Sequence, residues 1–291
     1  MLTALQLQEQ RRRRAVPSLK HQYQEYILQR IESYKNNLSR RELLDLGDMA
    51  ISEMETAQGE QFLLTEVLLT DWVDRLIHRR LGLQPYTRWA KHCRQLRSAQ
   101  REPTHWGIDR RCPVSRLLPR LEPGDSALVI GMDAAPMAFL LAAHDVEVTF
   151  IGQDMNLVDQ IESRVAEEAL GHYCVTYVTP TGQLPHDLRP QVHLVVLDTG
   201  TLDPETSSAR REILHKLMDR TAPGGIHLVV PSEHALAPDA YLSHYGEWTR
   251  ENLPPERRRP ARSFGLLLGK PPEVEVTERA APRPASRNAT G

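Results

Sequence analysis

The sequence predicts a two-part protein in which a helical region precedes an α/β domain with a mostly parallel sheet. After residue 125, short apolar segments typical of buried strands alternate with segments of helical periodicity. Before residue 105, apolar residues instead recur every three or four positions, as in amphipathic helices. The charge changes near residue 120, because residues 1–120 carry 21 Lys and Arg against 14 Asp and Glu, whereas residues 121–251 carry 7 against 20. The 291 residues suffice for two such domains.

The helical part is expected to contain four helices from residue 19 onward. Ser39 and Glu42 stand in capping-box spacing before the second helix, and Gly82 is a candidate C-cap after the third. We expect the apolar stripes to pack on one another or on the second domain, and a homodimer interface is the alternative. The stripe residues are Tyr23, Ile27, Ile31, Leu68, Trp72 and Leu76.

Composition divides the chain into five parts. These are a flexible basic arm over residues 1–18, a helical domain over 19–105, a connector over 106–125, the α/β domain over 126–270 and a disordered tail over 271–291. The run Arg11–Arg14 in the arm is either solvated or a contact for nucleic acid or anionic lipid. Trp106 on the Pro-rich connector either fills the domain junction or covers a ligand pocket.

The α/β domain is expected to consist of six strands with helices between them. The strands are expected at residues 126–131, 146–152, 173–179, 192–198, 222–231 and 263–271, and the helices at 136–143, 156–170 and 207–220. The last strand is a candidate antiparallel edge strand. Sheets of this kind bind ligands at the carboxyl ends of their strands, so we expect Gly131 and Asp198, which end two strands, to lie at one edge.

Several kinds of site are not indicated by the sequence. A dinucleotide fingerprint would need Gly in place of Asp133 and Pro136, so a nicotinamide-dependent dehydrogenase is not expected. Cys93, Cys112 and Cys174 are scattered and no His or Cys motif has metal-ligand spacing, so we expect neither disulfides nor a metal. No apolar run reaches the ~20 residues of a membrane span, and the N-terminus lacks signal-peptide order, which predicts a cytoplasmic protein without membrane contact.

Four segments between residues 121 and 230 carry a recognisable order of motifs. They read LEPGDSALVIGMDAAP, VEVTFIGQDMNLVDQIESRVAEEA, VHLVVLDTGTLD and LHKLMDRTAPGGIHLVV. In this order they resemble the first strand with its glycine-rich loop, the second strand with its helix, the fourth strand, and the fifth strand with its preceding helix in class I S-adenosylmethionine-dependent methyltransferases. The resemblance covers about residues 115–270. It implies a Rossmann-like fold and S-adenosylmethionine as the cofactor.

The resemblance also implies which residues contact the cofactor. They are Gly131, Asp133, Ala135, Gln153, Asp154, Thr181 and Asp198. Three positions that are usually acidic in the family hold Val129, Gly152 and Thr181 here. Asp154 is either a substitute for the missing ribose-binding acid or the N-cap of the next helix. Asp198 either faces the ligand or caps the turn at Thr199–Gly200.

Methyl transfer from S-adenosylmethionine to an unidentified acceptor, such as a small molecule, is the activity that the resemblance implies. In-line positioning can suffice for this reaction, so no catalytic residue is assigned. The three replaced acids favour an alternative, a non-catalytic methyltransferase-like binding or assembly module. A third hypothesis is nucleic-acid binding through the basic helical region, although we do not expect a nucleic-acid partner.

Overall fold

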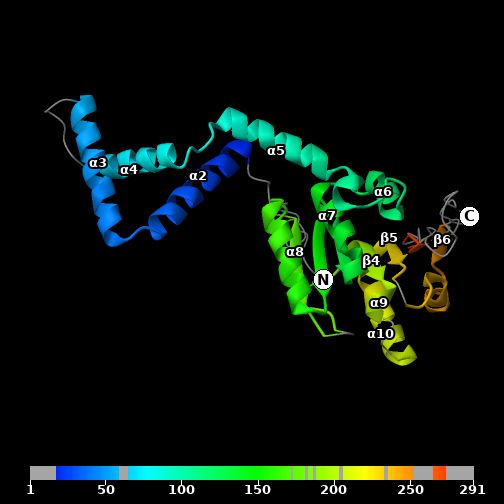
Figure 1. Ribbon diagram of the computed structural model, residues 1–291. Coiled ribbons are helices and arrows are strands. Elements are labelled where there is room, and N and C mark those ends of the chain that lie inside the picture. The colour runs from blue at the N-terminus through cyan, green and yellow to red at the C-terminus, as the bar shows by residue number, and fades with distance from the viewer. Residues whose placement is uncertain are drawn as a thin grey trace, which may run out of the picture. The chain divides into compact units, whose positions relative to one another are not determined.

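A computed structural model describes most of the chain (Figure 1). The described residues are 18–58, 65–171, 173–180, 183–185, 188–202, 206–232, 235–251 and 265–272. Nearly all of the predicted arm and tail, and also Thr181, lie outside these ranges. The chain divides into two compact units, Met1–Gln100 and Arg101–Gly291, which we call the helical unit and the α/β unit.

Four helices make up the described part of the helical unit. They are α2 (Leu19–Asn36), α3 (Arg40–Gln58), α4 (Glu66–Arg80) and α5 (Tyr86–Gln100). A small core joins α2, α3 and α4, and its buried residues are Ile31, Leu46, Ala50, Leu76 and Ile77. Ile27 and Trp72 pack against this core. The predicted helical periodicity is therefore confirmed, because residues of both stripes lie where the helices meet.

The predicted helix ends are formed by the expected side chains. The backbone N–H of Ser39 donates to the Glu42 carboxylate at 2.7 Å, and the N–H of Glu42 donates to Ser39 Oγ at 3.3 Å. This is the reciprocal capping box that the spacing predicts. Gly82 follows α4 with a φ of +59°, a left-handed conformation that Gly adopts at little cost after a helix.

The α/β unit begins with three short helical turns where the sequence predicts an irregular connector. They are η1 (Pro103–Trp106), α6 (Pro113–Leu117) and η2 (Leu118–Arg120). The strands are β1 (Ser126–Ile130), β2 (Glu147–Gly152), β3 (Cys174–Val178), β4 (Val192–Asp198), β5 (Thr221–Val230), β6 (Thr249–Glu251) and β7 (Leu266–Gly269). Between them lie η3 (Met132–Ala134), α7 (Ala135–Ala143), α8 (Met155–Glu167), α9 (Thr199–Leu202), α10 (Ser207–Arg220) and η4 (Pro238–His244).

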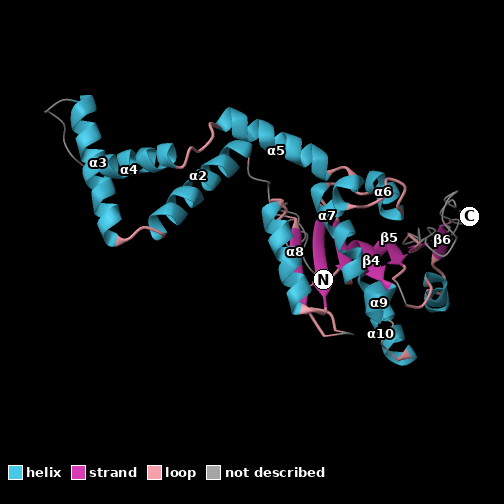
Figure 2. Cartoon of the chain, in the orientation of Figure 1, coloured by secondary structure: helices cyan, strands magenta, loops and turns pink. Residues whose placement is uncertain are grey.

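The strands form one seven-stranded sheet with the order β3-β2-β1-β4-β5-β7-β6 (Figure 2). Strands β1 to β5 pair in parallel, whereas β7 is antiparallel to both β5 and β6. The first five strands have the 3-2-1-4-5 order of a doubly wound sheet, in which the order reverses between β1 and β4. The predicted Rossmann-like fold is confirmed.

Each face of the sheet carries its own hydrophobic core. One core contains α7 and α8 residues such as Leu140, Val158 and Ile161, and the other contains α10 residues such as Leu214 and Leu217. The helices thus cover both faces, and this explains why β1 and β4 are apolar along nearly their whole length.

Trp106 belongs to the core on the α7 face, although the sequence places it on a connector. Its ring is 8% exposed and lies 5.2 Å from the ring of Phe139. Trp106 and Phe139 also line a cavity of about 320 Å³. The residue therefore contributes to the stability of the α/β unit, whatever else it contacts.

The C-terminal part of the sheet differs from the sequence prediction. The last predicted strand is antiparallel but internal, because β7 lies between β5 and β6. Strand β6 and the turn η4 were not predicted, since both are short and lack a clear apolar period. Strand β5 contains an irregularity in its pairing with β4, and Gly224 within it has a φ of +73°.

No helix among the described residues is both long and apolar enough to cross a membrane. The same residues contain no group of three or more His, Cys, Asp or Glu side chains that could hold a metal ion.

Candidate functional site

The carboxyl edge of the sheet is the candidate site, because the strand order reverses there between β1 and β4. Gly131 directly follows β1, and Asp198 is the last residue of β4. The two strands pair in parallel up to Ile130 and Leu197, so Gly131 and Asp198 are neighbours. Their predicted placement at one edge is confirmed. Ligands of doubly wound sheets bind at this kind of switch point.

Gly131 has a backbone conformation that requires glycine. Its φ is +97°, and a Cβ atom added to it would lie less than 3.0 Å from side-chain atoms of both Asp198 and Thr201. The loop after β1 is therefore in close contact with α9, the helical turn that follows β4. Little room is left between these two loops for another molecule.

The Asp198 carboxylate is almost fully buried and is hydrogen-bonded within the protein. It accepts the backbone N–H of Asp133 at 3.0 Å and that of Thr201 at 3.2 Å. Burial raises the pKa of Asp198, and the nearby Asp133 carboxylate adds to this effect, whereas the donated N–H groups oppose it. Asp198 caps the turn of α9, as one interpretation of the sequence expects, and it also ties α9 to the loop after β1.

Further polar contacts join the loops after β2 and β5 to α9 and to the loop after β1. Ser232 Oγ donates to the Asp133 carboxylate, and the backbone N–H of Ser232 donates to Thr199 Oγ1 at 2.9 Å. Gln153 Nε2 donates to the backbone oxygen of Thr201 at 3.3 Å. We call these contacts the carboxyl-edge network and define its members as Asp133, Gln153, Asp198, Thr199, Thr201 and Ser232. Its hydrogen bonds connect the loops that follow β1, β2, β4 and β5.

The end of β2 lacks both an acid and the space for one. A Cβ atom at Gly152 would lie 2.5 Å from Cγ2 of Val158 and 3.3 Å from the ring of Phe150. An Asp at this position would therefore displace the packing of α8 on β2. Asp154 follows two residues later and is the N-cap of α8, because its Oδ1 accepts the N–H groups of Asn156 at 2.8 Å and Leu157 at 3.4 Å.

Replacing Asp154 with Ala is expected to lower the free energy of unfolding by about 1 kcal/mol, the usual cost of losing an N-cap side chain. Asp154→Asn should retain most of the stability, because an Asn side chain also accepts these N–H bonds. Thermal denaturation of both variants measures the difference. Equal losses in the two variants would mean that the Asp154 charge, rather than the cap, matters.

Four of the seven residues predicted to contact a cofactor come together at this edge, namely Gly131, Asp133, Gln153 and Asp198. Ala135 instead begins α7 and is 6% exposed, and Asp154 faces its own helix. Thr181 is outside the described residues. The sequence prediction missed Thr199, Thr201 and Ser232. Their only signal is that they follow strands at the carboxyl edge, where any polar residue is a candidate.

S-adenosylmethionine fits these residues only in part as they are arranged. Its ribose hydroxyls need an acceptor after β2, where Gly152 offers none and Oδ1 of Asp154 already accepts the N–H groups that begin α8. In the loop after β1, the N–H of Asp133 already donates to Asp198, and the Asp133 carboxylate already accepts from Ser232. The polar groups of the carboxyl-edge network therefore hydrogen-bond one another, although Asp133 and Gln153 are also exposed to solvent.

Comparisons with known proteins bear on the fold. The sequence matches no protein-family model, and no relative is found among curated proteins. Similar solved structures include an rRNA methylase from Streptococcus thermophilus, with 16% identity over 54% of this chain and 93% of that chain and a TM-score of 0.42. The N-methyltransferase NodS from Bradyrhizobium japonicum has 16% identity over 55% and 93% of the two chains, with a TM-score of 0.44.

A TehB-like SAM-dependent methyltransferase from Corynebacterium glutamicum is also similar, with 14% identity over 64% of this chain and 97% of that chain and a TM-score of 0.43. At these values the likenesses identify neither a substrate nor a cofactor for this chain. The strand order and the two covered faces establish the fold. The α/β unit is a Rossmann-like, doubly wound sheet, which is the fold that the sequence resemblance implies.

Proposed function

We propose that the α/β unit is a methyltransferase-like fold that acts as a binding or assembly module without S-adenosylmethionine. The carboxyl-edge network is the observation that carries this proposal. It occupies the place where the fold binds its ligand, and it uses the buried Asp198 carboxylate and the Asp133 N–H internally.

Binding a cofactor here would require several of these contacts to break at once. Asp198 is 3% exposed, so separating it from the Asp133 and Thr201 N–H groups would leave a buried carboxylate with unmet hydrogen bonds. Such a loss costs about 1–3 kcal/mol for each group, and more for a charged one. The cofactor would have to offset this cost with no acid at Gly152, the last residue of β2.

Methyl transfer to an unidentified, small-molecule acceptor is the second candidate function. One observation favours it: a buried carboxylate with a raised pKa, Asp198, stands beside Gly131 at the switch point of the sheet. Groups with displaced pKa values in such places are often functional. This candidate requires S-adenosylmethionine to bind, so a single titration separates the two functions.

Calorimetric titration of the full chain with S-adenosylmethionine and S-adenosylhomocysteine is expected to show no binding at cofactor concentrations up to about 1 mM, which corresponds to a binding free energy weaker than about 4 kcal/mol. A cooperative thermal transition recorded on the same sample controls for folding. Saturable binding of either compound below this concentration would contradict the proposed role as a binding or assembly module without S-adenosylmethionine. It would support methyl transfer instead.

Two further features remain predictions of the sequence. One is a cytoplasmic location, and the other is a homodimer through the helical unit, which is the alternative to packing within the chain. Fractionation of cells and light scattering of the purified chain would test them separately.

A further inference from the structure

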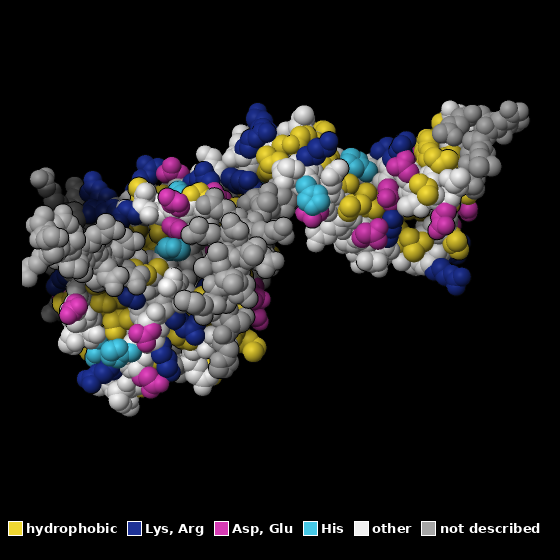
Figure 3. All heavy atoms as spheres, turned by 180° about the vertical axis from the view of Figure 1, so that it is seen from behind, with side chains coloured by type: hydrophobic (Ala, Val, Ile, Leu, Met, Phe, Trp, Pro, Cys, Tyr) yellow, Lys and Arg dark blue, Asp and Glu magenta, His cyan; other side chains and the backbone are white. Residues whose placement is uncertain are grey.

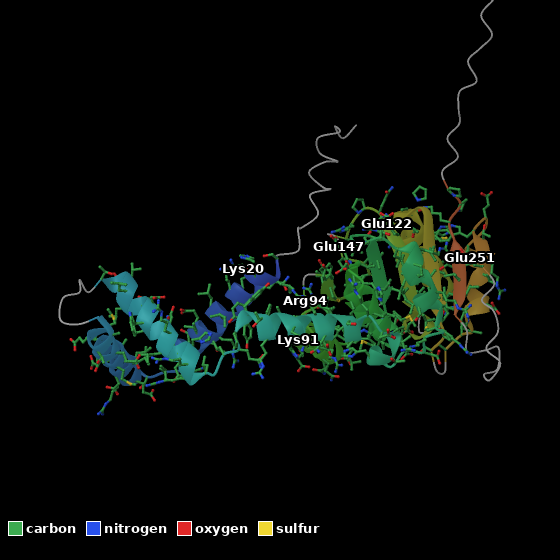
Figure 4. All side chains as sticks on the ribbon, turned by 90° about the horizontal axis from the view of Figure 1, so that it is seen from above. Lys20, Lys91, Arg94, Glu122, Glu147 and Glu251 are labelled. Carbon is green, nitrogen blue, oxygen red and sulfur yellow. The ribbon has the colours of Figure 1, made fainter. Side chains whose placement is uncertain are left out.

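Helix α5 carries a concentrated positive charge. Arg88, Lys91, Arg94 and Arg97 lie on it, and residues 81–100 contain no Asp or Glu. The first three recur at steps of three residues, which places neighbouring cations about 5–6 Å apart along the helix. Lys20, near the start of α2, lies in the same unit, as Figure 4 shows together with Lys91 and Arg94. We define the α5 basic face as Lys20, Arg88, Lys91 and Arg94.

The cations of this face are not neutralised by the protein. None of the four makes an ion pair with any residue in the described ranges, and Arg88, Lys91 and Arg94 are all exposed. Some other cations of the unit are paired, for example Lys35 with Asp74 at 2.8 Å, whereas Arg30 and Arg40 also make no ion pair with a described residue. The α5 basic face therefore presents positive charge that a polyanion can neutralise.

Aromatic rings hold α5 against α2 directly beside these cations. The ring of Tyr23 lies 5.5 Å from that of Tyr86 and 5.3 Å from that of Trp89, and the ring of Tyr26 stacks on Trp89 at 5.9 Å. All four rings are only half-buried. In Figure 3, Lys and Arg side chains border a hydrophobic patch over this part of the unit. The rings thus fix the helix and leave partly accessible aromatic surface next to the charges.

We propose that the α5 basic face binds single-stranded nucleic acid through its phosphate backbone. Regularly spaced, unpaired cations match a chain of phosphates, and half-exposed rings beside them can stack on unpaired bases. A membrane surface fits less well, because no exposed large hydrophobic side chain of the described residues lies on α5. Single-stranded nucleic acid would then be a partner of the binding or assembly module proposed above, and this assignment rests on that proposed function. The assignment replaces the sequence expectation that no nucleic acid is bound.

The test measures binding of the full chain to a fluorescein-labelled 20-nucleotide oligouridine by anisotropy, from 50 to 300 mM salt. With about four phosphates neutralised, the slope of log affinity against log salt should be roughly −3, since each phosphate contributes about −0.7. Lys91→Gln/Arg94→Gln should weaken binding about tenfold or more at 50 mM salt and reduce the slope by roughly 1.4.

A matched control removes two positive charges from another exposed helix face. Arg211→Gln/Lys216→Gln on α10 should leave the affinity within about twofold of the unaltered chain. If this control weakened the affinity for the oligouridine equally, the loss would be explained by net charge alone. The proposal would then be overturned.

Three other results would also overturn it. The first is no binding by the unaltered chain at 50 mM salt, and the second is equal binding to vesicles that contain anionic lipid. The third is binding that survives Lys91→Gln/Arg94→Gln but is lost when Arg11–Arg14 are changed to Gln, which would place the nucleic-acid contact at Arg11–Arg14. Because none of these measurements uses S-adenosylmethionine, their failure is distinct from the failure of the proposed function in the calorimetric titration.

Discussion

Replacing Gly131 with Ala is expected to lower the free energy of unfolding of the α/β unit by about 2–6 kcal/mol. A residue with a side chain in an unfavourable backbone conformation costs about 1–3 kcal/mol, and Gly131 has a φ of +97°. The new methyl group would also collide with Asp198 and Thr201, and inserting a methyl group into a packed site costs about 1–3 kcal/mol. Urea denaturation followed by circular dichroism measures the loss.

Gly124→Ala is the matched control for this variant. Gly124 has a φ of +89°, but a Cβ atom there would meet no atom within 4 Å, so only the backbone cost applies. Its loss of stability should therefore be smaller than that of Gly131→Ala. Adding Thr201→Gly to Gly131→Ala should recover part of the difference, because one of the two colliding side chains is removed. If both glycine variants lose the same amount, the loops after β1 and β4 are not in close contact.

Lowering the pH is expected to destabilise the α/β unit through His227, a buried residue of β5. Burial, together with the smaller effect of the Lys270 charge, lowers the pKa of His227 from 6.5 to about 3. The unfolded chain therefore binds a proton at a pH where the folded chain does not. The stability that this histidine contributes is complete above pH 6.5 and is lost as the pH falls from 6.5 towards 3. The loss amounts to about 2 kcal/mol between pH 6.5 and 4.5.

The hydrogen bonds of His227 explain why it stays neutral in the folded protein. Thr221 Oγ1 donates to the backbone oxygen of Leu217 at 2.7 Å, so it accepts from Nε2 of His227 at 2.7 Å. Nδ1 of His227 then accepts from the hydroxyl group of Tyr245 at 3.0 Å. This assignment of the ring protons follows from the hydrogen-bond network. A second proton on the ring would replace the acceptor that Tyr245 needs.

Denaturation of the unaltered chain and of His227→Gln at several pH values tests this prediction. The difference in unfolding free energy between the two proteins should shrink by about 2 kcal/mol from pH 6.5 to pH 4.5. His92→Gln, which removes an exposed imidazole on α5, controls for the loss of a histidine as such. A constant difference between the unaltered chain and His227→Gln would mean that His227 titrates alike in the folded and unfolded states.

Local patterns were sufficient to predict most helices and strands. The strand over residues 192–198 and the helix over residues 207–220 coincide with β4 and α10, because the apolar period and the polar ends are local properties. The capping box of Ser39 and Glu42 was predictable for the same reason. Strand β6 could not be predicted, since three residues are too few to show a period, and its place depends on pairing with β7.

The candidate site was predictable only in its position. Gly131 and Asp198 could be placed at one edge, because parallel strands bring their carboxyl ends together. The partners of these residues could not be predicted. Thr201 and Ser232 come from loops after different strands, and their contacts with Gly131 and Asp133 depend on how those loops pack. The capping interpretation of Asp154 is confirmed by its hydrogen bonds at the start of α8, whereas a cofactor contact of this residue stays a prediction.

The sequence by itself determined the α/β class, the order of strands along the chain and the basic character of α5. These properties follow from apolar periods and charges that are local in the chain. Only the tertiary structure decided that the carboxyl edge is closed by its own side chains and that β7 is inserted between β5 and β6. Both depend on contacts between residues far apart in sequence, whose geometry is set when the loops and strands pack together.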